Sequence, residues 1–346
     1  MWQDEEREPA LHCFANDGLG FEPCTTWSNV PHATLETPSK PAVAAWSENG
    51  TSRVDAFAIS AEKRSLIHSF EKDVSLVSND EGYLWGNWTT VTQDAGPLFV
   101  CMPGDEPHVH FIRPSNGQLR HVYWDPNGTK WTERDGQNSF TLNIKPETLV
   151  VGCIAGGDLR FDAYGYDTSD NTMVQRQYVV SGSAESGYVG TLESSISMAN
   201  VDTKIKFIGE PLLLQTSSDL YDLFTIGENK TMYHNRYRSI GAPKETQSLE
   251  GSFVSNPAAV SGSSGNIEVV AVGSNGHLKY GKFDGSNWGG WEDMGINANG
   301  APFMRSVQGK IFLVYEVENR EIEYISWEFG KRWQDHSEPI KLEEKI

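Results

Sequence analysis

PAAVSGSSGNIEVVAVGSNGHLKYGKFDGSNWGGWED, residues 257–293, gives the clearest indication of the fold class. It contains two apolar runs, 267–272 and 278–283, and ends in the pair Trp288 and Trp291. Short apolar runs bounded by Gly, Asn and Ser are typical of antiparallel strands joined by tight turns. Together with the proline-led run at its start, the stretch predicts one four-stranded antiparallel sheet. Because such a sheet cannot bury both of its faces alone, we expect the unit to be repeated.

The same unit recurs about every fifty residues. Each copy begins with an apolar run after a proline, which is tolerated at the first residue of a strand because no ladder bond needs its N–H. These prolines are Pro41, Pro97, Pro146, Pro211, Pro257 and Pro302. Second strands are predicted at 54–59, 109–112, 161–166, 221–226, 267–272 and 312–317. Third strands are predicted at 66–70, 119–124, 173–178, 232–237, 278–283 and 322–327. Outer strands are expected often to end in tryptophan, at Trp88, Trp131, Trp291 and Trp333. The pattern predicts an all-β fold, a six-bladed β-propeller with four antiparallel strands per blade.

The propeller is expected to occupy residues 41–338 as one domain, since a propeller is one domain whatever its length. Residues 1–40 would form an N-terminal extension and 339–346 a C-terminal tail. We expect the extension, or the tail, to close the ring by packing on the blade around Trp327. A seventh blade built from both ends of the chain is the alternative.

Composition restricts the class of partner. The net charge of −19 argues against nucleic acid and against an anionic membrane surface. No apolar run is long enough to insert in a membrane, and no secretory signal is recognised, so we expect a cytoplasmic monomer, or a secreted one if a signal was removed. No Cys/His spacing, G-x-S-x-G sequence or Gly-rich phosphate loop occurs, so we predict no metal and no cofactor.

Pairs of ionisable residues lie about symmetrically around three predicted hairpin turns. The candidate catalytic residues are Asp55 and His68, His110 and His121, and Asp222 and His234. Residues placed in this way are cross-strand neighbours, with Cβ atoms about 4.5–5.5 Å apart. A carboxylate beside an imidazole fixes the tautomer of the ring, as a general acid or base requires. The other interpretation is that each pair only stabilises its blade by a hydrogen bond between two strands, because buried polar groups need partners.

The inner strands are expected to line the central channel with apolar side chains and few polar groups. The candidate ligand-binding residues are Trp46, Phe99, Met102, Leu149, Leu213, Gln215, Phe303, Met304 and Arg305, with Tyr221 and Tyr233 as an aromatic wall beside the first-choice catalytic pair, Asp222 and His234. Such a funnel suits one small, hydrophobic, oxygenated ligand. A channel plugged by its own side chains is the alternative.

Two segments resemble blades of the fucose-binding propeller lectins of fungi and bacteria: LKYGKFDGSNWGGWEDMG, 278–295, and LRHVYWDPNGTKWTE, 119–133. The resemblance implies sugar sites between blades, built from an Arg on the second strand, a Glu on the third and aromatic residues. By position, the Arg falls on Asp55, His110, Asp162, Asp222, Glu268 and Leu313, and the Glu on His68, His121, Gln175, His234, Tyr280 and Tyr324. No blade keeps the Arg–Glu pair.

A lectin-like chain without the sugar-binding residues also resembles the propeller protein of trichothecene gene clusters in Fusarium. That resemblance implies a sesquiterpenoid ligand and a ring-forming or rearrangement step. We therefore predict a cofactor-independent cyclase, isomerase or lyase of fungal secondary metabolism that binds and transforms one small hydrophobic metabolite by metal-free acid–base chemistry. A carbohydrate-binding propeller lectin is the first alternative. A non-catalytic protein-interaction propeller is the second.

Overall fold

The computed structural model describes short segments of the first forty residues and most of the chain from residue 42 to residue 341. The described N-terminal segments are 2–3, 9–11, 14–16, 21–23 and 28–29. Within 42–341 the gaps are 49–50, 62, 73–86, 102–107, 126–129, 134–141, 155–158, 170–172, 184–186, 198–205, 218–219, 239–245, 263–264, 308 and 319–320.

Six sheets each contain four strands that pair antiparallel in chain order. The first is formed by β6 (Ala42–Glu48), β7 (Thr51–Ser60), β8 (Ser65–Lys72) and β9 (Thr89–Thr92). The second is formed by β10 (Leu98–Cys101), β11 (His108–Arg113), β12 (Gln118–Asp125) and β13 (Lys130–Glu133). The third is formed by β14 (Val150–Ile154), β15 (Leu159–Tyr166), β16 (Met173–Ser183) and β17 (Gly187–Ser197).

The second half of the chain repeats this arrangement. The fourth sheet is formed by β18 (Phe207–Ser217), β19 (Leu220–Gly227), β20 (Met232–Arg238) and β21 (Gln247–Ser248). The fifth is formed by β22 (Ala258–Ser261), β23 (Ile267–Val272), β24 (His277–Phe283) and β25 (Glu292–Asn297). The sixth is formed by β26 (Asn299–Val307), β27 (Lys310–Glu316), β28 (Ile322–Glu328) and β29 (Ile340–Lys341).

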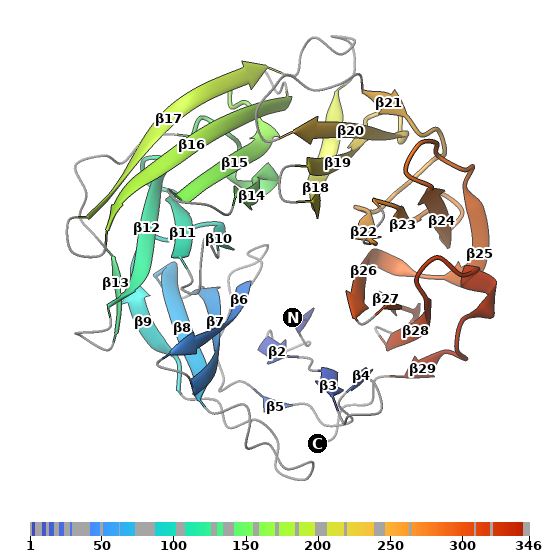
Figure 1. The fold of residues 1–346 in the computed structure, drawn as a ribbon, viewed down its shortest axis with the longest axis horizontal. Helices are drawn as coiled ribbons and strands as arrows, with labels where there is room; N and C mark the ends of the chain where they lie inside the picture. The colour runs from blue at the N-terminus through green and yellow to red at the C-terminus, as the bar shows by residue number, and fades with distance from the viewer. Residues whose placement is uncertain are drawn as a thin grey trace.

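The six sheets stand around a central axis with the first strand of each toward the middle (Figure 1). Inner strands of consecutive sheets contact one another, from β6 and β10 through to β22 and β26. The predicted six-bladed β-propeller is confirmed. No helix in the described part of the chain is long and apolar enough to cross a membrane.

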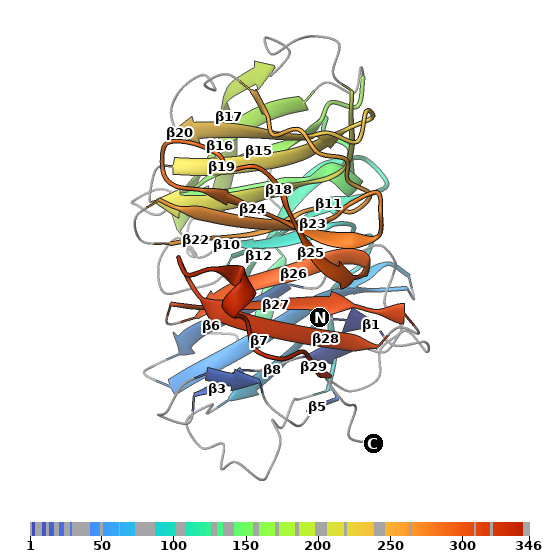
Figure 2. The same cartoon turned by 90° about the vertical axis from the view of Figure 1, so that its right-hand side faces the viewer.

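Short strands near the N-terminus form two small sheets of their own. β1 (Trp2–Gln3), β2 (Pro9–Leu11) and β5 (Ser28–Asn29) form one, and β3 (Phe14–Asn16) and β4 (Phe21–Pro23) form the other. Both lie between the first and the sixth blade (Figures 1 and 2). The fourth strand of the sixth blade comes from the C-terminal end of the chain, because β29 pairs with β28.

The prolines occupy three different places rather than one. Pro97 and Pro257 immediately precede β10 and β22, as predicted. Pro211 and Pro302 lie inside β18 and β26, where the pairing register shifts, because a bulge accommodates a residue that has no N–H to donate. Pro146 begins a short 3-10 helix, η2 (Pro146–Thr148), before β14. The prediction that each proline begins an inner strand is therefore wrong for Pro146, Pro211 and Pro302. Pro41 lies outside the described residues.

The prediction that outer strands end in tryptophan is also wrong. Trp131 is the second residue of β13, and Trp88 and Trp291 immediately precede β9 and β25. Trp333 begins the 3-10 helix η5 (Trp333–Asp335) ahead of β29. Trp88, Trp131 and Trp291 thus lie where an outer strand begins, and Trp333 lies in the connection before β29.

Hydrophobic side chains fill the spaces between neighbouring blades. Between the fourth and fifth blades, for example, Phe224 and Ile226 pack with Val269 and Phe283 in one buried cluster. Complete burial of a side chain of this size stabilises the fold by about 1.5–3 kcal/mol. Because the larger clusters each draw on two neighbouring sheets, polar groups placed between these blades are surrounded by close-packed side chains.

Candidate functional site

The strand register places two of the predicted pairs diagonally. Asp55 lies opposite Phe70, and His68 lies opposite Phe57, so the centre of this hairpin is one residue further along than predicted. The pair formed by Asp222 and His234 is displaced in the same way. Since side chains alternate along a strand, diagonal partners still share one face of the sheet and can bond.

This register changes the assignment in the second blade. His110 lies directly opposite His121, as predicted, and so takes the position that Phe57 has opposite His68. The residue equivalent to Asp55 is therefore His108, whose Nδ1 atom is 2.9 Å from Nε2 of His121. The prediction that His110 corresponds to Asp55 is therefore wrong, because His108, two residues earlier, takes that position.

A buried polar cluster joins the first and second blades. Arg53 donates hydrogen bonds of 2.8 Å from both Nε and Nη2 to the carboxylate of Asp55, and Nε2 of His68 bonds the same group. The guanidinium of Arg53 lies 4.0 Å from the ring centre of Trp124. Trp131 points its indole Nε1 at His68, 3.0 Å away. Burial lowers the pKa of His68 despite the nearby Asp55 carboxylate.

A second cluster with the same chemistry joins the fourth and fifth blades. His234 Nε2 lies 2.6 Å from Asp222 Oδ1, and Trp288 donates its indole N–H to His234 Nδ1 at 3.2 Å. Because the indole N–H donates to Nδ1, the hydrogen bond to Asp222 is made through Nε2. Arg236 donates from Nε and Nη2 to Asp222, at 2.8 and 3.2 Å, and Thr216 donates at 2.9 Å. Burial alone would raise the pKa of Asp222, but the bonds from His234 and Arg236 hold it below its usual value.

The two clusters differ in their access to solvent. Arg53 is 1% exposed, whereas the side chain of Arg236 is 22% exposed. Arg236 lies 4.6 Å from the ring centre of Phe283, and Trp288 beside it is half-buried. Arg236 and Trp288 of the cluster between the fourth and fifth blades are therefore partly accessible to solvent, whereas the cluster around Arg53 is closed.

Three imidazoles are stacked in the second blade. The ring centres of His108 and His121 are 5.0 Å apart, those of His121 and His110 are 4.7 Å apart, and Phe99 continues the stack 5.1 Å from His110. Burial lowers the pKa of His108 to about 4 and that of His110 to about 3. These rings are therefore neutral near pH 7. In the part of the chain that the structure describes, no group of metal-binding side chains is arranged around an ion site.

The predicted aromatic wall does not form beside the first-choice pair. Tyr221 and Tyr233 are buried, and Tyr221 belongs to the cluster between the third and fourth blades. Because neighbours alternate along a strand, both tyrosines lie on the face opposite Asp222 and His234. The aromatic side chains that lie against His234 are Trp288 and Phe283 of the fifth blade and Phe224 of its own blade.

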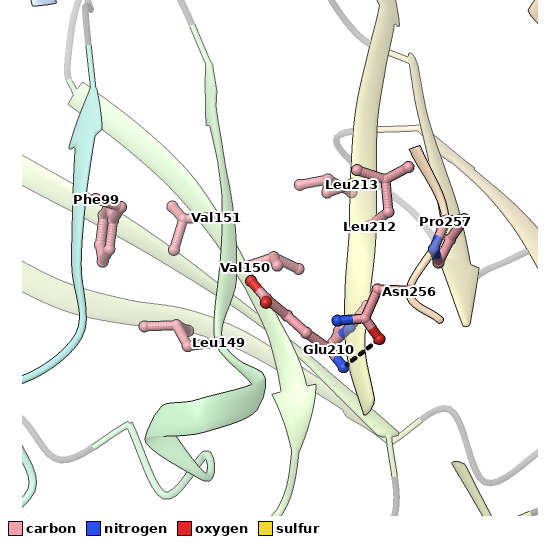
Figure 3. Close-up of a pocket in the computed structure, with 10 residues that line it drawn as sticks. Phe99, Leu149, Val150, Val151, Glu210, Leu212, Leu213, Asn256 and Pro257 are labelled. Atoms are coloured by element: carbon pink, nitrogen blue, oxygen red, sulfur yellow. Dashed lines mark hydrogen bonds between the residues drawn. The ribbon is translucent and has the colours of Figure 1, made fainter. Parts of the chain in front are cut away.

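Some of the predicted channel residues do lie on the inner strands with access to solvent. Phe99, Leu149 and Leu213 line a pocket of about 280 Å³ (Figure 3). Phe303 is 48% exposed on β26, and Arg305 and Gln215 are also exposed.

The remaining channel candidates lie elsewhere. Met304 is 6% exposed and packs in the core between the fifth and sixth blades, so its placement in the channel is wrong. It alternates with Phe303, which faces the opposite side of the strand. The side chain of Trp46 and the whole of Met102 lie outside the described residues.

Two arginines of these clusters, Arg53 and Arg236, were not among the site residues predicted from the sequence. Arg53 precedes Asp55 by two residues on its own strand, and Arg236 lies directly opposite Asp222 on the next strand. Both places share a face with the acid. A search at every second residue, and at the register partner, would have found them.

Together the six sheets and the polar clusters between them define a six-bladed β-propeller with charged interblade sites. No family model and no curated protein sequence matches the chain. The solved structures that resemble it include the fucose-specific lectin from Aleuria aurantia, with a TM-score of 0.55 and 13% identity over 88% of this chain and 95% of that one. A mutant of the lectin from the same fungus, in complex with alpha-methyl-L-fucoside, gives 0.53 and 14% identity over 88% and 96%. A lectin from Burkholderia pseudomallei gives 0.63 and 11% identity over 96% and 94%.

These comparisons overturn the prediction of an enzyme that transforms a hydrophobic metabolite. The similar structures are lectins. None of them relates the chain to trichothecene gene clusters or to a catalytic activity.

Proposed function

We propose that the protein is a carbohydrate-binding propeller whose site lies between the fourth and fifth blades. The observation that carries the proposal is the solvent access of Arg236 and Trp288, which are held in place by Asp222 and His234. A guanidinium group offers directed hydrogen bonds to hydroxyl groups, and an indole offers a flat apolar face. A pyranose ring presents hydroxyl groups on its edge and C–H groups on its face.

Rigid placement supports this role. Asp222 accepts bonds from His234, Arg236 and Thr216, so the polar groups of the site are fixed before a ligand arrives. Preorganised groups lose little conformational freedom on binding. The equivalent cluster around Arg53 is closed by Trp124, so we expect one open site of this kind rather than a repeated one.

Fucose is the first sugar to test, because two of the similar structures are a fucose-specific lectin and a lectin bound to a fucoside. The expected arrangement of Arg and Glu is absent, and an Asp–His–Arg group stands in its place. We therefore expect a carbohydrate preference that a glycan array can identify, with fucosides among the candidates.

The test compares two variants that each remove one cation. Arg236→Gln should weaken binding of the preferred glycan at least about tenfold, the cost of losing charge-assisted hydrogen bonds of about 1.5 kcal/mol. Arg305→Gln, at an exposed arginine on an inner strand, should leave the affinity unchanged. A blank glycan array, or equal losses in the two variants, would contradict the proposal.

A further inference from the structure

The space between the sixth and the first blade differs from the other five spaces between neighbouring blades. At each of those five, one buried hydrophobic cluster draws side chains from both blades. At the sixth, the described residues form two separate clusters. The sixth-blade face contains Phe312, Val314 and Tyr324, with Ile322 packed against them. The first-blade face contains Ala58 and Ile67, with Trp88 packed against them.

Both faces are turned toward this space, and both are covered. Phe312 and Val314 alternate along β27 with residues that pack against the fifth blade, so they lie on the other side of the sheet. Ala58 likewise alternates along β7 with residues that pack against the second blade. Ala58 is 1% exposed and Phe312 is 2% exposed. This burial needs a covering group, and neither cluster includes a described side chain of the opposite blade.

The strand order of the described chain does not tie the first blade to the sixth. Each of the six blades is built from four strands that follow one another along the chain. Among the described strands, none from the N-terminal segments joins the sixth sheet, and none from the C-terminal end joins the first. The ring therefore has to close by the packing of side chains in this space.

The N-terminal extension, residues 1–40, lies in the right place and has a suitable sequence. Its two small sheets lie between the first and the sixth blade (Figures 1 and 2). The register of β3 and β4 puts Phe14 and Phe21 on the same face of their hairpin. The extension also contains Leu11, Trp27 and Leu35. Large apolar residues of this kind gain free energy when they pack against apolar faces and leave water.

We propose that residues 1–40 close the ring by docking between the sixth-blade face and the first-blade face, in place of direct packing between these two blades. The extension is thus the intramolecular partner of both faces. Its loss would expose two apolar faces at once, and exposed apolar patches are surfaces through which proteins associate. The proposal is independent of carbohydrate binding, because the site around Arg236 lies between the fourth and fifth blades.

Photo-cross-linking on the whole chain tests what covers the sixth-blade face. p-Benzoylphenylalanine in place of Tyr324 should cross-link to peptides from residues 1–40, identified by mass spectrometry. The same replacement of Tyr280, whose ring centre lies 6.4 Å from that of Trp327 in the cluster between the fifth and sixth blades, is the control and should cross-link within those blades. Cross-links from position 324 that never include residues 1–40, whether they reach the first blade or a second molecule, would overturn the proposal. If the variant at Tyr324 does not fold, the same replacement of Ile322, which is only partly buried, decides.

Cutting the chain tests whether packing alone holds the extension in place. A protease recognition sequence inserted between Ser39 and Lys40 allows the folded protein to be cleaved and then passed over a size-exclusion column. The released fragment should elute with the blades, and should separate from them in urea. If the fragment does leave, the remaining chain should self-associate or melt at a lower temperature than the uncleaved protein. A fragment that leaves behind a monomer with an unchanged melting temperature would overturn the proposal.

Discussion

Replacing His110 by phenylalanine should make the protein less sensitive to acid. His110 is 1% exposed, and burial, followed by repulsion from His108, lowers its pKa to about 3. Phenylalanine should fit, because Phe57 and Phe224 take the corresponding buried positions in the first and fourth blades. The substitution therefore removes a titrating group with little change in packing.

The magnitude follows from the difference between the folded and unfolded pKa of His110. The unfolded imidazole takes up its proton as the pH falls below about 6.5, whereas the folded one stays neutral until about pH 3, so the unfolded state binds more protons in between. The stabilising contribution is complete above pH 6.5 and decreases as the pH falls. Acidification from pH 7 to pH 5 should remove about 2 kcal/mol through this side chain alone.

The assay is urea unfolding followed by tryptophan fluorescence, at pH 7 and at pH 5. The wild type should lose more free energy of unfolding than His110→Phe does, by about 2 kcal/mol. Other buried histidines, including His108, keep titrating in the variant, so its own loss should not vanish. His277→Gln, at a partly exposed histidine, is the control and should behave as the wild type. Equal losses in wild type and His110→Phe would refute the reasoning.

Two further substitutions test the stability of the polar cluster and of the bulge. Asp222→Asn should lower the free energy of unfolding by about 3 kcal/mol, because it breaks a buried ion pair. Asp293→Asn, at a carboxylate that is 42% exposed, should lower it by less than about 1 kcal/mol. Equal shifts of the urea midpoint in the two variants would contradict this. Gly209→Ala would place a Cβ atom 2.5 Å from Oδ1 of Asn256, so it should lower the melting temperature more than Gly276→Ala, where φ is also positive but nothing lies within 4 Å. Equal melting temperatures would show that the contact with Asn256 is not tight.

The central strands of each blade could be predicted from the sequence because they are buried on both faces. β23 has the predicted bounds, Ile267–Val272, since every one of its residues is buried and the run is uniformly apolar. The outer strands gave no such signal. β25, Glu292–Asn297, is mostly exposed and follows the tryptophan pair rather than preceding it, so its sequence carries no apolar run.

The positions of the prolines and the register of the hairpins depend on three-dimensional packing. Pro211 reads as the start of a strand, yet β18 begins four residues earlier and passes the proline through a bulge. Likewise, the sequence does not locate the centre of the turn between β7 and β8 to within one residue. Asp55 and His68 were therefore predicted to lie directly opposite each other, whereas they are diagonal neighbours. Moving the centre of a hairpin by one residue moves each cross-strand partner by two residues. The residues that lie directly opposite each other then change, but each side chain stays on the same face of the sheet.

The candidate site was found in part because its acid and base are recognisable in sequence. Asp222 and His234 do bond, as predicted, and so do Asp55 and His68. The indole of Trp288 comes from the neighbouring blade, and contacts between blades leave no trace in the spacing of a single repeat. The exposure of Arg236, which distinguishes the open cluster from the closed one, likewise depends on the packing of two blades.

The most direct test of a carbohydrate site between the fourth and fifth blades is a tryptophan fluorescence titration with methyl glycosides, beginning with alpha-methyl-L-fucoside. Trp288 is half-buried, and its ring centre lies 5.2 Å from that of Phe283, which Arg236 covers, so a sugar bound there should change its emission. The proposed function predicts a saturable change with at least one glycoside, and its loss in Trp288→Ala, with Trp291→Phe keeping it. A titration in which no glycoside gives a saturable change, or in which Trp288→Ala responds as the wild type does, would contradict it.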